Sequence, residues 1–162
     1  MFKRFIAYFP ILSLLIMLFS SCGQQSTAIS PKAIDEEVDV CGACMMMVQD
    51  NQYSAQVVKT NGEAFKFDDI GCMAMYIIDN QPGGQPFVRD FYTSEWLKVE
   101  DAFFVLTDEV ETPMNYGFLA FTNKSDRDQF LAESKGEEIS WNEVIEIMKE
   151  RGSHHENELS YH

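Results

Sequence analysis

Positive charge is scarce in this chain of 162 residues, which carries 26 acidic side chains against 12 lysines and arginines. Lys3 and Arg4 precede the first acidic residue, so the imbalance is larger still in the rest of the chain. A surface this acidic repels the phosphates of nucleic acids and the head groups of anionic lipids. The composition therefore argues against nucleic-acid binding and against membrane attachment through a basic patch.

An apolar run long enough to cross a bilayer is also missing, since about 20 residues are needed. The longest run, residues 5–19, is shorter and contains Pro10. It follows two basic residues and leads through two serines into Cys22. This order is typical of a secretory signal peptide, and the final cysteine is typical of the bacterial lipobox. Residues 1–21 are therefore predicted to be a lipoprotein signal peptide, with Cys22 as the lipidated residue.

Lipidation of Cys22 predicts a protein anchored to the extracytoplasmic face of a membrane, in the periplasm or at the cell surface. A lipoprotein cysteine carries more than one acyl chain, which gives stable anchoring. An ordinary signal peptide and an uncleaved N-terminal anchor remain as alternatives. Residues 22–37 are rich in Gln, Ser, Thr and acidic side chains, so we expect them to form a flexible, lipid-anchored tether.

The rest of the chain is long enough for one domain and too short for two independent cores. Residues 38–150 are predicted to form this domain, and residues 151–162 a polar tail. All three histidines lie in the tail: His154, His155 and His162. We expect them to be solvated rather than to bind a metal ion.

Strand and turn patterns predict an α+β fold. Strands are expected at residues 53–60, 63–67, 87–92, 102–107 and 116–122. Asn61-Gly62 is a strong hairpin signal between the first two strands, and Gln81 to Gly84 breaks the chain after the first helix. A segment containing Trp96 joins the third and fourth strands. The strand–helix unit at residues 65–78 resembles the one at residues 118–131, which indicates two related halves.

Capping patterns predict three helices. Asp68 or Asp69 caps a helix that extends to about residue 79. Ser125 with Asp128 opens a second helix that ends at Gly136. A third helix begins at the capping box formed by Ser140 and Glu143, and it ends near Gly152.

The most informative stretch joins a C-x-x-C motif to a run of methionines. Cys41 and Cys44 can direct both sulfurs to one point, and Met45, Met46 and Met47 follow at once. Thiolate and thioether sulfurs are soft donors that favour Cu(I) over hard cations. With Cys72, three cysteines follow Cys22, so an exported protein would keep at least one unpaired thiol. Metal binding gives that thiol a function.

Two further segments offer sulfur. Cys72 and Met75 follow Asp68-Asp69, and on a helix they share a face distinct from the buried stripe that includes Ile70 and Met73. They could therefore lie near the first cluster, although a buried Cys72 that only packs is an open alternative. Pro113 keeps the residue before it extended, which places Met114 in a constrained loop before a strand.

Other chemistry at Cys41 and Cys44 remains open in part. Haem attachment needs a histidine at the position of Met45, and a Cys₄ zinc site needs a fourth cysteine that the folded part lacks. A thiol–disulfide oxidoreductase using Cys41 and Cys44 is the main rival to a metal carrier. A structural disulfide between them, with the methionines packed as core side chains, is a third interpretation.

Taken in order, these elements resemble the NosL family of copper-chaperone lipoproteins. The family pattern has a lipobox cysteine, then C-x-x-C-G-M-x-V, then a strand–helix element that reads Phe67 to Met73 here, then a Pro-Met loop before a strand. This sequence departs from the pattern at two glycines, which are replaced by Met45 and Asn115. Asn tolerates left-handed backbone geometry, so the turn after Met114 is expected to persist.

The resemblance implies Cu(I) ligands at Cys44, Met46 and Met114. Further candidate ligands complete the set: Cys41, Cys72, Met45 and Met75. It also implies an α+β domain of two related ββα-containing halves. The implied activity is not enzymatic and has no small-molecule substrate. The protein would carry Cu(I) to an exported copper enzyme, for which nitrous oxide reductase is the acceptor that the family suggests.

Overall fold

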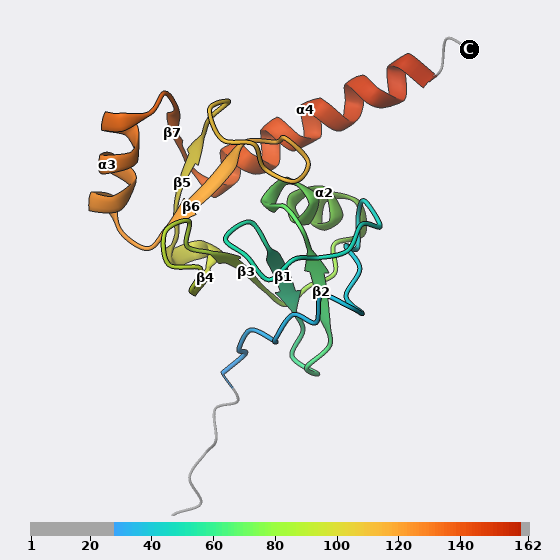
Figure 1. Ribbon diagram of the computed structural model, residues 1–162. Coiled ribbons are helices and arrows are strands. Elements are labelled where there is room, and N and C mark those ends of the chain that lie inside the picture. Colours follow the sequence, from blue (N-terminus) through green and yellow to red (C-terminus); the bar gives the residue numbers. More distant parts are fainter. Residues whose placement is uncertain (1–27, 160–162) are drawn as a thin grey trace, which may run out of the picture.

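The computed structural model describes the backbone of residues 28–159 and the side chains of residues 28–152. The predicted signal peptide and Cys22 lie outside these residues. Two antiparallel sheets lie side by side, with the helices packed against them and against each other (Figure 1). The first sheet has the order β2-β1-β3-β4 and the second the order β6-β5-β7.

The strands are short and their bounds are as follows. The first sheet contains β1 (Ala55–Val58), β2 (Ala64–Phe67), β3 (Gln85–Arg89) and β4 (Trp96–Lys98). The second contains β5 (Phe103–Leu106), β6 (Phe118–Phe121) and β7 (Glu137–Ile139). The helices are α2 (Ile70–Asn80), the 3₁₀ turn η3 (Val99–Asp101), α3 (Lys124–Glu133) and α4 (Trp141–Leu159).

One arrangement is repeated in the two halves. In the first, the β1–β2 hairpin leads into α2, and β3 returns to pair with β1. In the second, β5 and β6 lead into α3, and β7 returns to pair with β5. The α+β class and the two related halves are thus confirmed. The halves differ in their hairpin connections, which span residues 59–63 in the first and the longer segment 107–117 in the second.

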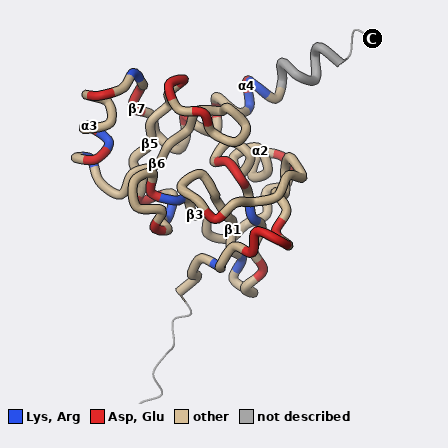
Figure 2. Tube along the Cα trace, in the orientation of Figure 1, with Lys and Arg blue, Asp and Glu red and all other residues tan. Residues whose placement is uncertain are grey.

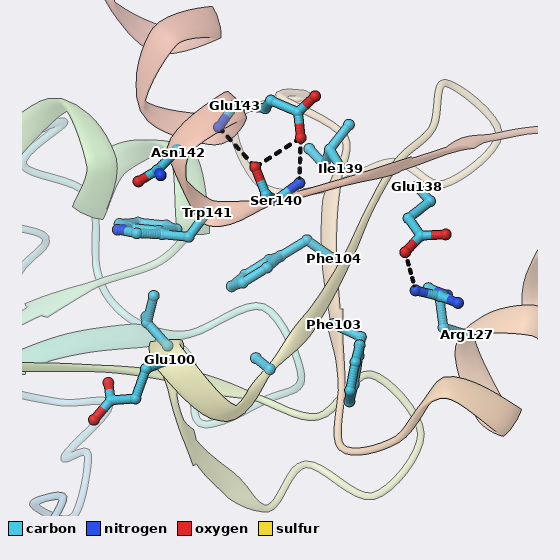
Figure 3. Close-up of a pocket in the computed structure, with 12 residues that line it drawn as sticks. Glu100, Phe103, Phe104, Arg127, Glu138, Ile139, Ser140, Trp141, Asn142 and Glu143 are labelled. Carbon is cyan, nitrogen blue, oxygen red and sulfur yellow. Dashed lines mark hydrogen bonds and ion pairs between the residues drawn. The ribbon is translucent and has the colours of Figure 1, made fainter.

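The residues at the helix ends explain where the helices begin. The Asp69 side chain accepts a hydrogen bond from the Gly71 N–H at 2.8 Å and caps α2. Gln81, with a φ of 44°, ends this helix in the left-handed conformation. Ser140 and Glu143 form the expected capping box of α4, visible in Figure 3, in which each side chain bonds the backbone N–H of the other.

Several sequence-based boundaries were wrong. Asn123, not Ser125, caps α3, because its side chain accepts from the Asp126 N–H, and this helix ends at Glu133. The third helix does not stop near Gly152 but continues to Leu159. The Trp96 segment is a strand paired with β3 rather than a connection. The strand β7 had not been expected, since Glu137 and Glu138 are exposed and only Ile139 is buried.

The main core joins the two halves. Phe67, Met73 and Phe118 are buried together with Met148 of α4, which packs along α2. The carboxylate of buried Asp90, after β3, accepts hydrogen bonds from the N–H and hydroxyl of Thr122, after β6, at 2.7 and 2.9 Å. These bonds link the end of β3 in the first half to the end of β6 in the second.

The chain before Val38 also contacts the first sheet. The Lys32 N–H donates to the Gln56 side chain at 2.9 Å, and that side chain donates back to the Lys32 carbonyl at 3.1 Å. The Lys66 ammonium donates to the Ala33 carbonyl at 2.6 Å. Contacts of the domain thus begin before the boundary expected at residue 38.

Candidate metal centre

A tight reversal of the chain brings Cys41 and Cys44 together. The Cys41 N–H donates to the Met46 carbonyl at 2.8 Å, and the Met45 N–H donates to the Cys41 carbonyl at 3.1 Å. Val40 and Met47 form an antiparallel bridge that closes the loop. Met45 has a φ of 64°, a left-handed conformation that favours glycine. The loop leaves the Cys44 N–H 3.5 Å from the sulfur of Cys41.

The second part of the centre lies where β2 passes into α2. Asp68 follows the last residue of β2, and Cys72 lies in the first turn of α2. The Asp69 cap fixes this turn. Asp68 precedes this cap and Cys72 follows it, and a carboxylate oxygen of Asp68 lies within 4.8 Å of the Cys72 sulfur. The Gly42 N–H also donates to the Lys66 carbonyl of β2 at 3.0 Å, which holds the cysteine loop against this strand.

Together these segments form a cluster of four ligand atoms. The sulfurs of Cys41, Cys44 and Cys72 and a carboxylate oxygen of Asp68 all lie within 4.8 Å of one another. Cys41 and Cys72 are fully buried, Asp68 is almost fully buried, and Cys44 is partly exposed. The Cys44 thiol donates to Asp68 Oδ2 at 3.2 Å. Asp68 Oδ1 is buried without a hydrogen-bond partner among the described residues.

The three thiols are electrostatically coupled. A hydrogen bond from the Cys72 thiol lowers the pKa of Cys41 to about 6, against the effect of burial, and backbone N–H groups add to the lowering. The same bond raises the pKa of Cys72, and burial adds to that rise. Burial also raises the pKa of Cys44 to about 12, and its bond to Asp68 contributes in the same direction. Of the three cysteines, Cys41 is therefore the one whose ionisation this coupling favours.

Of the predicted ligands, the structure brings Cys44, Cys41 and Cys72 together. Cys72 lies near the first cluster, as the sequence suggested, and its side chain is fully buried in the core, which was the open alternative for its environment. Met75 is half-buried and packs against that core. Asp68 had been considered only as a helix cap. Its position at the end of a strand, four residues before Cys72, is the signal that indicates its proximity to the thiols.

The methionines occupy two different environments. Met45 and Met46 lie on the cysteine loop with large exposed fractions. Met114 lies on the long β5–β6 loop and packs partly against the core. Its N–H donates to Asp69 Oδ2 at 3.2 Å, and the Thr112 hydroxyl donates to the same oxygen at 2.6 Å. The Met114 loop is therefore bound to the residue next to Asp68.

A close contact fixes the same loop against α2. A Cβ added at Gly71 would lie 2.2 Å from the ring of Tyr116, so only glycine allows the ring this position. Asn115 has a φ of 54° and its N–H donates to the Thr112 carbonyl at 2.8 Å, which is the turn expected at this residue. Burial raises the pKa of the Asp69 carboxyl, while its hydrogen bonds act in the opposite direction.

The second half contains a separate hollow of about 600 Å³ (Figure 3). It lies between β5, β7 and the start of α4, and Phe103, Phe104 and Trp141 line it. Arg127 at its edge forms ion pairs with Glu138 and Asp128. None of the predicted ligands lines this hollow.

The model of the NosL family matches residues 31–148, which is most of the described chain. The chain belongs to the NosL family. Met45, which stands where the NosL pattern has glycine, has the left-handed backbone that explains that glycine.

One solved structure similar to this NosL domain is the crystal structure of the copper chaperone NosL from Shewanella denitrificans. The TM-score is 0.63 and the sequence identity 16%, over 72% of this chain and 96% of that chain. At this identity the likeness establishes the fold. No functionally curated protein matches the chain. Family membership confirms the expected resemblance and the expectation that the protein is not an enzyme. Among the described residues, no helix combines the length and apolar character that a bilayer span requires.

Proposed function

We propose that this protein binds Cu(I) at the cysteine cluster and passes it to an acceptor protein outside the cytoplasm. The observation that carries the proposal is the approach of three thiols and a carboxylate oxygen to within 4.8 Å of one another. Thiolate sulfur selects soft ions such as Cu(I). Membership of a family that includes a copper chaperone supports the same cargo.

Cys44 is the proposed exchange ligand. It is the one cluster cysteine that is partly exposed, so an incoming ligand from an acceptor can reach a metal ion bound there. Cys41 has a lowered pKa and is buried, which suits it to retain the ion. In this proposal Met46 and Met114 supply thioethers, since they lie on the two loops that flank the cluster. Asp68 accepts a hydrogen bond from the Cys44 thiol while the ion is absent.

Transfer would proceed by stepwise exchange of ligands. A Cu(I) ion tolerates two, three or four soft ligands, so each acceptor ligand can enter as one ligand of the carrier leaves. The lipidated Cys22 and residues 22–37 would hold the domain close to the membrane, facing the periplasm or the cell exterior. The proposed acceptor is an exported copper enzyme, with nitrous oxide reductase as the acceptor that the family suggests.

The test is an anaerobic Cu(I) titration of the domain against a Cu(I) chelator of known affinity. The wild-type protein should compete for one equivalent. Cys44→Ser, Met46→Ala and Met114→Ala should each weaken the affinity by at least tenfold. Met47→Ala is the matched control, since Met47 lies on the same loop but is not a proposed ligand. Failure of the wild-type protein to compete, or equal affinity in all variants, would contradict the proposal.

A thiol–disulfide oxidoreductase is the second candidate, and the lowered pKa of Cys41 is the observation that favours it. An attacking thiolate must reach its substrate, however, and Cys41 has no exposed surface. This function predicts turnover of a disulfide substrate that survives Met46→Ala and Met114→Ala. Absence of turnover in the reduced wild-type protein would eliminate it.

A further inference from the structure

Exposed apolar side chains gather in one place on this molecule. Among the described residues, five of the six large hydrophobic side chains that are exposed lie on the cysteine loop or the segment paired with it. These five residues, which we name the lip, are Val38, Val40, Met45, Met46 and Met47. The sixth, Tyr92, lies on the turn between β3 and β4. Exposed apolar residues that gather in one segment mark an interaction site more often than scattered ones do.

The lip directly borders the metal centre. Its two segments run antiparallel, joined by the Val40–Met47 bridge and by the Val48 N–H to Asp39 carbonyl bond at 2.9 Å. Cys41 and Cys44 lie in the loop between them. Met45 is 73% exposed although its backbone is left-handed. A strained conformation that holds an apolar side chain in solvent is a recurrent property of functional surfaces.

An acidic turn lies beside the lip. Asp35, Glu36 and Glu37 immediately precede Val38, and this stretch of acidic residues is visible in Figure 2. The Asp50 N–H donates to Glu36 Oε1 at 2.7 Å, which holds the turn against the residues that follow the lip. Nearby Asp39 and Asp50 are compensated by ion pairs with Lys66 and Arg89. The turn itself has no ion pair among the described side chains, so its negative charge faces solvent.

We infer that the lip and the acidic turn form the docking surface for a protein partner whose contact face has an apolar centre and a rim of lysine and arginine. The apolar centre covers Val38 and the lip methionines, and the basic rim faces Asp35, Glu36 and Glu37. Such docking places the partner's metal ligands over Cys44. The inference rests on the proposed copper transfer and specifies how the partner is recognised.

Two other occupants fit the surface less well. Anionic lipid head groups would be repelled by the acidic turn. A second copy of this chain would use the same patch on both sides of a two-fold axis, which brings two acidic turns close to each other. A basic partner satisfies the apolar and the charged parts at once. Electrostatic complementarity of this kind speeds association and selects the partner.

The experiment uses the full-length lipoprotein in the cells that make it, with a photo-crosslinking amino acid at position 38. The same amino acid at position 92, also exposed and apolar, is the matched control. A covalent adduct with a protein is expected at position 38 and not at position 92. Peptide mapping should place the adduct on an apolar surface flanked by lysine or arginine.

The second part of the experiment reverses the charge of one residue in the acidic turn. Glu37→Lys should reduce the adduct at position 38 at least fivefold, because it reverses the sign of the charge next to the lip. Glu133→Lys, an equal change on α3 of the other half, should leave the yield unchanged. An adduct with lipid or with a second copy, no adduct, an equal yield at position 92, or insensitivity to Glu37→Lys would each overturn the inference.

Copper binding is measured separately on the same variants. Neither Val38 nor Glu37 is a proposed ligand, so both variants should keep wild-type Cu(I) affinity while the adduct or its yield changes. If the wild-type protein does not bind Cu(I), the proposed function fails whatever the cross-linking result. If Cu(I) binding is intact and the adduct is absent, only the docking surface fails.

Discussion

The thiol of Cys44 donates to Asp68 Oδ2 at 3.2 Å, while the second oxygen of Asp68 is buried without a hydrogen-bond partner among the described residues. The bond to Asp68 thus adds to the effect of burial, which raises the pKa of the partly exposed Cys44 and favours its protonated form. Metal binding requires Cys44 to lose that proton, because the thiolate is the ligand.

Asp68→Asn should make Cys44 more reactive. The pKa of Cys44 is raised to about 12, mainly by burial and also by its bond to Asp68, and the amide removes the negative charge. The pKa should fall, and the rate of Cys44 alkylation by iodoacetamide at pH 8 should increase severalfold in the metal-free protein. Asp79→Asn, at an exposed position of α2, should have no effect. An unchanged rate in Asp68→Asn would show that burial alone sets this pKa.

One thiolate should titrate near pH 6 in the reduced, metal-free protein. The pKa of Cys41 is lowered to about 6 from an ordinary value of 9.0, so absorbance at 240 nm should rise by one thiolate as the pH increases through 6. Cys41→Ser should abolish this step. Cys72→Ala should move it to higher pH, because the hydrogen bond from Cys72 is the largest cause of the lowering.

The lowered pKa of Cys41 also predicts how the free energy of unfolding depends on pH. A lowered pKa means that ionised Cys41 stabilises the folded state, fully above pH 9 and progressively less as the pH falls through 6. The difference in unfolding free energy between the wild-type protein and Cys41→Ser should therefore shrink from pH 9 to pH 5. A difference that grows over this range would assign the thiolate to another cysteine.

Gly71→Ala should displace the loop that carries Met114. The added Cβ would lie 2.2 Å from the Tyr116 ring, and overpacking of this kind typically costs about 1–3 kcal/mol. Chemical denaturation should show this loss, and Cu(I) affinity should fall with it. Gly152→Ala is the control, since no atom lies within 4 Å of its added Cβ and alanine favours a helix by about 0.5–1 kcal/mol. Equal stability of the two variants would mean that the ring moves freely.

Met45→Gly should relieve backbone strain. The left-handed conformation of Met45, with a φ of 64°, costs a non-glycine residue about 1–2 kcal/mol. Part of this gain is lost to the greater freedom of glycine in the unfolded chain, so we expect a net stabilisation of about 0.5–1 kcal/mol. Met47→Gly, in the bridge with Val40, should destabilise instead. A destabilised Met45→Gly would indicate that the exposed thioether contributes to folding.

The sequence predicts those parts of this fold that depend on local chemistry. Asp69 caps α2, Ser140 and Glu143 cap α4, and the Asn61-Gly62 turn joins β1 to β2, because each signal acts within a few residues. The start of α3 was misplaced by two residues, since Asn123 competes with Ser125 as a cap. Short edge strands such as β7 carry too few apolar residues to give a pattern.

The metal centre was predicted in part for a similar reason. The C-x-x-C loop is local, and its two sulfurs could be expected to converge. The full burial of Cys72 and the approach of Asp68 depend on how β2 and α2 pack against that loop. The hydrogen bonds from Thr112 and Met114 to Asp69 join residues more than forty positions apart, and no local pattern encodes such a contact. The methionine ligands remain a prediction.

The repeated ββαβ unit has a consequence for how many sites the protein carries. Asp68 and Cys72 precede and follow the cap of α2, and the equivalent positions around the cap of α3 are Thr122 and Asp126. The second half therefore has no sulfur where the first half has its cluster. Instead, its long β5–β6 loop reaches the first half, where the Thr112 hydroxyl donates a hydrogen bond to Asp69. The two halves therefore differ in what they contribute: the first holds the cysteine cluster, and the long loop of the second binds the residue next to it.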